Sequence, residues 1–397
     1  MLSSPYIALI SITIFAGACV RPSVPPVSPT LAPINAGDLR RGLTAFAHDT
    51  MMGREAGTIW NERATEFVGA QFRRLGVRPA GDNGTYFQIV PNLQPRDPTV
   101  PKGVARNVIG LIPGTDPTVR NEYVSITAHN DHIGYSREPV DHDSLKAYNT
   151  VVRPMGADSR RREMSPVEAA RIRTMVDSGR RAHSPRADSI FNGADDDGSG
   201  TIALIAIAKA FMTGHVKPRR SILLVSHTGE EKGLRGSDWF TDHPTIPIDS
   251  IVAEIDLDMV GRGAATDLAG GGPTYLEVVG LRRLSNEFGD MLVVVNARQP
   301  VPFAFNYEFD APGHPEQYYC RADHYSYARY GIPSVSVSRG GHMDYHMVTD
   351  EAQYIDYVDY ARLTQMIFDA AVFVANADHA PRVDGPRPAN PHVPCKQ

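Results

Sequence analysis

Two adjacent glutamates, Glu230 and Glu231, follow a short apolar run within residues 221–237. Residues 222–225 are leucine and β-branched residues, typical of a buried strand, and a glycine-punctuated loop comes after them. Neighbouring carboxylates repel each other, so this pair would protonate or move apart unless a cation held it. The pair therefore indicates a metal site. The alternative is a solvated loop with two unrelated charges and Lys232 as a partner.

A second strand-like run, residues 123–128, also ends in polar residues, His129-Asn130-Asp131-His132. At a strand end, a carboxylate can hydrogen-bond a histidine ligand and fix the tautomer of its imidazole. We interpret His129 as a metal ligand and Asp131 as its supporting carboxylate, with His132 as the competing ligand.

Three consecutive aspartates, Asp195 to Asp197, precede residues 201–211, which are apolar almost all round and therefore predict a buried helix. A helix N-terminus favours one carboxylate as a cap, which would explain Asp197. A cap alone does not explain three, so Asp196 joins the candidate ligands.

Two later strand-like runs end in the same manner. Residues 251–257 lead to Asp258, which is better placed than Asp256 for a cleft at the strand ends. Residues 334–337 lead to a loop with two histidines, of which at least one, such as His346, should face the cleft.

The five candidate ligand positions all lie at the end of a strand-like run or at the mouth of a helix: His129, Asp196, the Glu230-Glu231 pair, Asp258 and His346. In open α/β sheets these ends converge on one crevice. Histidines together with carboxylates suit zinc. Five ligands exceed what one zinc needs, so two ions that share a bridging carboxylate are the economical arrangement.

The order of elements predicts an α/β fold, a three-layer α/β/α sandwich around a mixed, mostly parallel sheet with the metal site at the C-terminal ends of the strands. Residues 58–75 have helical apolar spacing that ends at Gly76, as expected for a helix covering the sheet. Residues 363–374 indicate a long amphipathic helix near the end of the chain.

The chain divides by composition into a globular region and flanking segments. We expect an export signal at residues 1–19, a Pro-rich tether at 20–35, a single domain at 36–376 with an Arg-rich insertion at about 134–189, and a loose Pro-rich tail at 377–397. Small residues directly before Cys19 resemble a bacterial lipoprotein processing site, which would anchor an exported protein to the periplasmic or cell-envelope membrane by lipid. Cys320 and Cys395 allow one disulfide.

Composition excludes several classes of function. With 397 residues, 42% hydrophobic and 21% charged, the chain is typical of a globular protein, and its net charge of −5 does not indicate nucleic-acid binding. The glycines at 270–272 lack the spacing of a dinucleotide fingerprint. No Gly-x-Ser-x-Gly elbow occurs, which disfavours a serine hydrolase.

The motifs AHNDHIG, NGADDDGSG, TGEEKGLRGS, IDLDMVGR, ADHYSYARYGIPSV and HMDYHMVTD resemble those of the M28 family of zinc aminopeptidases, in that family's order, over about residues 39–373. The resemblance implies a complete set of zinc ligands: His129, Asp196, Glu231, Asp258 and His346. It further implies that Asp196 bridges two zinc ions, that Glu230 is the general base and that Asp131 supports His129. The insertion and the lack of room for a protease-associated domain are departures that bear on substrate choice.

The function that follows is a zinc-dependent exopeptidase, an aminopeptidase that hydrolyses peptides through a zinc-activated bridging water. A carboxypeptidase remains an alternative and would need a cation for the substrate carboxylate. The candidates near the motifs are Arg235, Arg262, Arg321 and Arg339. A single-zinc glutaminyl cyclase would not need the full ligand set. A non-catalytic, receptor-like ectodomain would be expected to lack ligands or Glu230.

Overall fold

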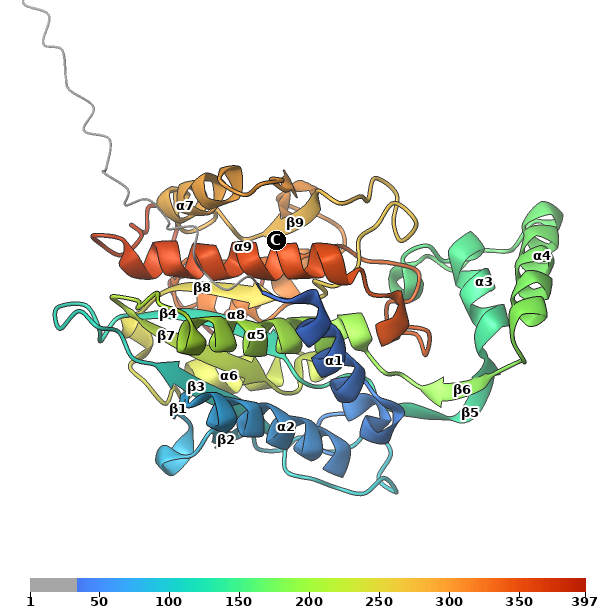
Figure 1. Cartoon of the computed structure of the whole chain (residues 1–397), viewed down its shortest axis with the longest axis horizontal. Coiled ribbons are helices and arrows are strands. Elements are labelled where there is room, and N and C mark those ends of the chain that lie inside the picture. The colour runs from blue at the N-terminus through green and yellow to red at the C-terminus, as the bar shows by residue number, and fades with distance from the viewer. Residues whose placement is uncertain (1–33) are drawn as a thin grey trace, which may run out of the picture. The chain divides into compact units, whose positions relative to one another are not determined.

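A mixed β-sheet lies at the centre of the computed structural model, which describes residues 34–397 (Figure 1). The strands follow the order β1 (Arg78–Pro79), β3 (Arg106–Ile112), β7 (Ser221–His227), β4 (Tyr123–His129), β8 (Ile251–Leu257), β11 (Ser334–Ser338), β9 (Tyr275–Val279) and β10 (Ala304–Asn306), and β2 (Phe87–Ile89) pairs with β3. The four central strands β7, β4, β8 and β11 are parallel. Strand β3 is antiparallel to β7, and β9 is antiparallel to β11, so the predicted mixed, mostly parallel sheet is confirmed.

The central strands are apolar because both of their faces are covered. Every residue of β7 is buried, and six of the seven residues of β4 are buried. A strand covered on both faces has a nearly continuous apolar sequence, which is why residues 222–225 could be recognised as a buried strand.

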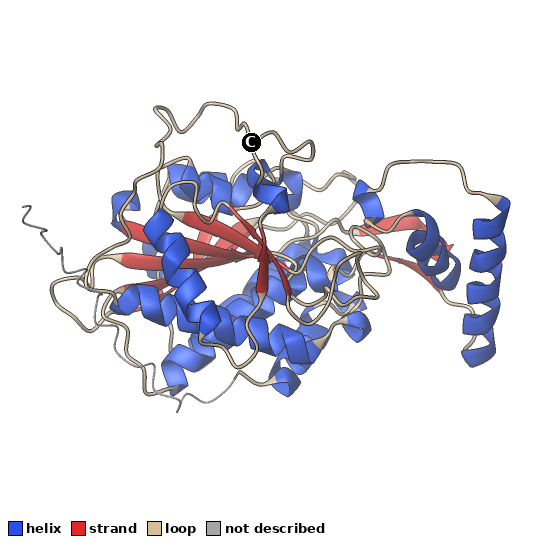
Figure 2. Cartoon of the chain, turned by 90° about the horizontal axis from the view of Figure 1, so that it is seen from above, coloured by secondary structure: helices blue, strands red, loops and turns tan. Residues whose placement is uncertain are grey.

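Helices cover both faces of the sheet, as Figure 2 shows. One layer contains α1 (Ala36–Phe46), α2 (Ile59–Leu75), α5 (Gly200–Thr213) and α9 (Tyr357–Asn376), with α7 (Asn286–Ala297) packed against α9. The opposite layer contains α6 (Arg235–Asp242) and α8 (His324–Ala328), whose Phe240 and Tyr327 pack against apolar residues of β3 and β7. The predicted three-layer α/β/α arrangement is therefore confirmed.

The ends of α2 illustrate how local sequence sets an element. The Thr58 side chain accepts a hydrogen bond from the backbone N–H of Asn61 at the start of the helix. Gly76 adopts a left-handed conformation with φ of 78° at the end, which glycine tolerates without a Cβ clash. The helix predicted at 58–75 is present with these caps.

The insertion contains more regular structure than the sequence indicated. Strand β5 (Tyr135–Asp141) pairs antiparallel with β6 (Ala187–Ile190). Helices α3 (His142–Val152) and α4 (Pro166–Ala182) come between these strands in the sequence and project away from the main sheet (Figures 1 and 2). A capping box formed by Ser165 and Glu168 is present at the start of α4. Helix α3 was not predicted because polar residues interrupt its apolar face.

The end of the chain is anchored. Cys395 forms a disulfide with Cys320, and the Gln397 side chain donates to the carbonyl oxygen of Phe309 at 2.6 Å. The expectation of a loose tail is therefore wrong at its end, because composition alone does not show such tertiary contacts.

The predicted export signal, including Cys19, and nearly all of the predicted tether lie outside the described residues. Between residues 34 and 397, no helix combines the length and the apolar character that crossing a bilayer requires.

Candidate metal centre

The candidate ligands come together at one edge of the sheet. His129 is the last residue of β4 and lies beside His227, the last residue of β7. Asp258 follows β8 directly, and Glu230 begins the short helical turn after β7. Because these parallel strands end at the same edge, side chains distant in sequence meet there.

One group of possible ligands consists of His129, Asp196 and Asp258. The Nε2 atom of His129 lies 3.2 Å from Oδ1 of Asp196 and 3.8 Å from Oδ1 of Asp258. The Nδ1 atom of His129 lies 3.2 Å from the main-chain oxygen of Asp131 and 3.6 Å from its carboxylate. The predicted support of His129 by Asp131 therefore comes mainly from the nearer backbone oxygen, which orients the ring so that Nε2 faces the carboxylates.

A second group consists of His132, Asp196, Glu231 and His346. The Nε2 atom of His346 lies 3.0 Å from both Oδ2 of Asp196 and Oε2 of Glu231. The Nδ1 atom of His132 lies 2.7 Å from Oε1 of Glu231. Asp196 belongs to both groups, one through each oxygen, which is the geometry of a bridging carboxylate.

Both groups fit metal ions by their chemistry. Several buried atoms that point into them have no hydrogen-bond partner: Nε2 of His129, Nδ1 of His132, Oδ2 of Asp196 and Oε1 of Glu231. Burying such atoms without a partner is costly, whereas a cation would satisfy all of them. Imidazole and carboxylate ligands are those that zinc prefers.

Electrostatics leads to the same conclusion for Asp258. Burial raises the pKa of this carboxyl to about 8, and the nearby charge of Asp196 adds to the increase. A bound cation stabilises the carboxylate form and reverses this shift. The site therefore gains its ligand charges when an ion binds.

Glu230 lies outside both groups but beside them. Its Oε2 atom is 3.9 Å from Nε2 of His129, and its backbone N–H donates to Oδ1 of Asp131 at 3.2 Å. Burial raises the pKa of Glu230 well above its usual range, and the charges of Glu231 and Asp258 raise it further. A carboxyl with a raised pKa at the edge of a metal centre is suited to accept and return a proton.

The alternative of a solvated loop does not agree with the structure. The Nζ atom of Lys232 contacts Oε1 of Glu55 at 2.8 Å and two backbone oxygens, rather than either glutamate of the pair. The side chain of Glu231 is only 4% exposed, and that of Glu230 is 14% exposed.

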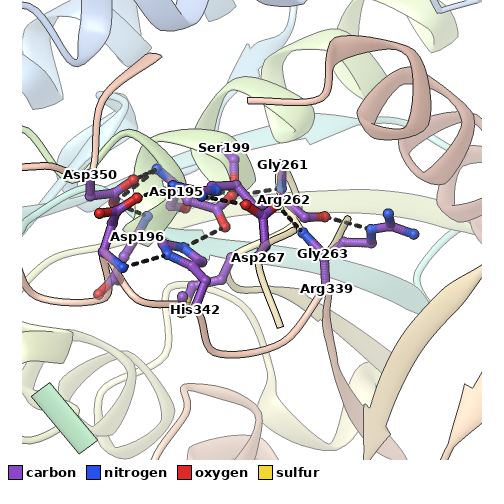
Figure 3. Close-up of polar contacts among 12 residues, drawn as sticks. Asp195, Asp196, Ser199, Gly261, Arg262, Gly263, Asp267, Arg339, His342 and Asp350 are labelled. Carbon is purple, nitrogen blue, oxygen red and sulfur yellow. Dashed lines mark hydrogen bonds and ion pairs between the residues drawn. The ribbon is translucent and has the colours of Figure 1, made fainter. Parts of the chain in front are cut away.

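A network of polar contacts holds the aspartate turn in place (Figure 3). Asp350 accepts hydrogen bonds from the backbone N–H groups of Asp195 and Asp196. The carboxylate of Asp195 accepts from the backbone N–H of Gly261 at 2.6 Å and lies 3.2 Å from Nε2 of His342. These contacts fix the backbone at Asp196, and they include His342, the histidine of the C-terminal loop that belongs to neither ligand group.

Asp197 and Arg54 hold the surrounding segments. Asp197 accepts from the backbone N–H of Gly200 at the start of α5, as predicted for a cap, and also from the backbone N–H of His129 at 2.9 Å. The fully buried guanidinium of Arg54 donates to the carbonyl oxygens of Asn130, Asn192 and Gly193. Sequence reasoning missed Arg54 because nothing local marks a buried arginine.

Two sequence interpretations are refined by the structure. Asp256 lies inside β8, where Thr127 donates to its carboxylate at 2.9 Å, and it belongs to neither ligand group. His132, named as a competitor of His129, joins the other group instead. Its place in the sequence, three residues after His129, gave no indication of which ligand group it would join.

A cleft opens onto the centre from the solvent. It is lined by residues of both ligand groups, the insertion and the β9 region, including Met155, Asp158, Glu230, Asp258, Met259, Glu277, Tyr318, Arg321 and Tyr345. Burial raises the pKa of Glu277 to about 7. The insertion thus contributes to the wall of the cleft, which the sequence could not establish.

The fold and the site define an α/β protein with a buried histidine and carboxylate centre at the carboxyl edge of its sheet. The family model for Peptidase family M28 matches residues 107–371, so the chain belongs to this family.

Individual relatives agree with this membership. The chain is 36% identical over 75 residues to a probable zinc metalloprotease of Pyrenophora tritici-repentis, a match that covers 19% of this chain and 17% of that protein. The chain spans less than a fifth of the length of the curated relatives it matches.

Solved structures share the fold at low sequence identity. A leucine aminopeptidase precursor from Bacteroides thetaiotaomicron is 16% identical with a TM-score of 0.57, over 86% of this chain and 98% of that one. The glutaminyl cyclase of Porphyromonas gingivalis is 17% identical with a TM-score of 0.56, over 85% of this chain and 98% of that one.

Proposed function

We propose that this protein is a zinc-dependent aminopeptidase that removes N-terminal residues from peptides. The observation that carries the proposal is a pair of ligand groups that share Asp196 at the base of a cleft with acidic residues. Two groups with one common carboxylate support a site for two zinc ions.

When bound, zinc lowers the pKa of a coordinated water toward about 7 and polarises the carbonyl of the scissile bond. Glu230 is the general base: it accepts the proton of the attacking water and delivers it to the leaving amine. Its carboxylate is available because neither ligand group includes it. Asp131 supports this arrangement by contacting both the His129 ring and the backbone N–H of Glu230.

The charges near the cleft favour a substrate ammonium over a substrate carboxylate. Of the four candidate arginines, Arg262 is buried and paired with Asp267 and Asp344, and the buried Arg339 donates to backbone oxygens. Arg321 lines the cleft, but Asp158 pairs with its Nη2 atom at 3.0 Å. The exposed Arg235 is not among the cleft residues. With these arginines engaged, Glu277 is the cleft carboxyl outside both ligand groups that we assign to a substrate ammonium, as an aminopeptidase requires.

The test is a panel of substrate pairs that differ only in whether the N-terminal amine is free or acetylated. We expect hydrolysis of peptides and aminoacyl anilides with a free amine, and a loss of kcat/KM of at least about 100-fold when the same amine is acetylated, because a charged contact is then lost. Cleavage from the C-terminus of N-acetylated peptides would indicate the carboxypeptidase instead. A peptide with N-terminal glutamine distinguishes the cyclase, which would release ammonia rather than free glutamine.

A further inference from the structure

His132 is held rigidly next to the ligands. The residue is fully buried, and its backbone N–H donates to the carbonyl oxygen of Arg54. Its ring lies against the backbone of Gly193, where an added Cβ would come within 2.4 Å of Cγ of His132. The ring therefore has little freedom to turn away from the metal centre.

The nitrogens of this ring have no hydrogen-bond partner, although Nδ1 is close to two carboxylates. Nδ1 lies 2.7 Å from Oε1 of Glu231 and 3.7 Å from Oδ2 of Asp196. Ligands of a tetrahedral zinc with bonds of about 2.0–2.2 Å lie roughly 3.3–3.6 Å apart. The His132 and His346 nitrogens and the Asp196 and Glu231 oxygens all lie within 4.8 Å of one another, and their nitrogen–oxygen contacts of 2.7, 3.0 and 3.7 Å lie on both sides of this spacing.

We propose that His132 is a fourth protein ligand of one ion, so that the two halves of the centre are chemically unequal. The half formed by His132, Asp196, Glu231 and His346 offers four protein ligands, whereas the half formed by His129, Asp196 and Asp258 offers three. This inference rests on the metal dependence of the function proposed above.

Because the two halves differ in their number of protein ligands, we expect the two ions to have different roles. Four protein ligands close a tetrahedral zinc site, as in structural sites, whereas three leave a position for water or substrate. The open position therefore belongs to the half with His129 and Asp258, beside the carboxylate of Glu230. The closed half retains its ion more tightly and holds the shared Asp196 in place.

The experiment measures metal binding by the full chain and by two variants, His132→Asn and His324→Asn. His324 is a matched control because it is also fully buried with both ring nitrogens unpartnered, and it belongs to neither ligand group. Zinc affinity is measured by competition with a chromogenic chelator, and the visible spectrum is recorded with one equivalent of Co²⁺.

We expect the wild type and His324→Asn to bind one ion more tightly than the other, with intense Co²⁺ absorption typical of four-coordinate geometry. In His132→Asn, the affinity for the tighter ion should fall by at least about 100-fold, and this absorption should weaken, because removing even a supporting partner costs 10–100-fold.

Two results would overturn the inference. Equal zinc affinities in His132→Asn and the wild type would show that His132 is not a ligand. A modest loss of affinity with an unaltered Co²⁺ spectrum would show that it only hydrogen-bonds Glu231. A wild-type protein that binds no zinc would instead refute the proposed function itself.

Discussion

At the scale of single residues, the adjacent glutamates have different surroundings. Replacing Glu230 should therefore affect a different property of the protein from replacing Glu231. Glu231 contacts two histidines, and although burial alone would raise its pKa, the charge of His132 and the hydrogen bond with His346 lower the pKa to about 2. Glu230 has no such contact within 3.5 Å, and its pKa is raised. One carboxylate is thus suited to bind a cation and the other to exchange a proton.

We predict that Glu230→Gln retains zinc but loses about 100-fold to 10,000-fold in kcat, with a smaller change in KM, because the amide cannot accept a proton. Glu231→Ala should lose zinc affinity together with the thermal stability that the ion supplies. Zinc content, kcat and Tm of both variants measure this directly. Normal turnover by Glu230→Gln would exclude it as the base, and zinc loss by that variant alone would reverse the two roles.

At the scale of elements, the insertion is tied to the loop that carries His346. Lys146 of α3 contacts Asp344 at 2.6 Å, and the backbone N–H of Ala157 donates to the carbonyl oxygen of Tyr345. Asp344 is fully buried and also contacts Arg262 at 2.6 Å. A substitution that breaks these contacts should therefore destabilise both the insertion and the loop that carries His346.

We predict that Asp344→Asn lowers the free energy of unfolding by about 3 kcal/mol, because two largely buried cations lose a charged partner. Arg262 retains Asp267, which limits the loss. Asp290→Asn is the control, since its pair with Arg282 is largely exposed and should contribute less than about 1 kcal/mol. Chemical denaturation of the three proteins measures the difference, and equal losses in both variants would contradict the prediction.

The insertion also influences the charge of the cleft through Asp158. In Asp158→Asn the guanidinium of Arg321 loses its carboxylate partner and repels a substrate ammonium. We predict a rise in KM for free-amine substrates of about fivefold, corresponding to about 1 kcal/mol, with little change in kcat. Glu168→Gln removes a carboxylate from the same insertion outside the cleft and should leave KM unchanged. A fall in KM for Asp158→Asn would contradict this assignment.

The main elements could be predicted from sequence because burial imposes a recognisable apolar pattern on them, continuous in a strand covered on both faces and helically spaced in a helix covered on one. The apolar run of β7 and the helical spacing of α2 have this property, whereas β5, β6 and α3 are polar and short, and tertiary packing decides their structure.

For the site, residue types at strand ends identified the five predicted ligands that the structure brings together. Their individual roles stay predictions. His132 and Asp350 could not be assigned because the direction of a side chain in a loop depends on packing between distant segments.

At the scale of the whole molecule, the candidate metal centre joins segments that are distant in the sequence. Its ligands come from β4, the turn before α5, the turns after β7 and β8, and the loop after β11. A cation held by such distant segments stabilises the folded chain, because the unfolded chain cannot present the ligands together.

We predict that dialysis against a strong chelator abolishes activity, and that zinc restores it with close to two ions per chain at saturation. The same treatment should lower Tm, because a ligand at 100 times its Kd stabilises the native state by about 2.7 kcal/mol, and removing it forfeits that contribution. Dialysis against zinc-saturated chelator is the control and should change neither quantity. Restoration of activity together with Tm shows that the chain itself remained intact. Full activity in metal-free protein would refute the metallopeptidase function, and saturation at one ion per chain would refute the two-ion site while leaving a single-zinc enzyme.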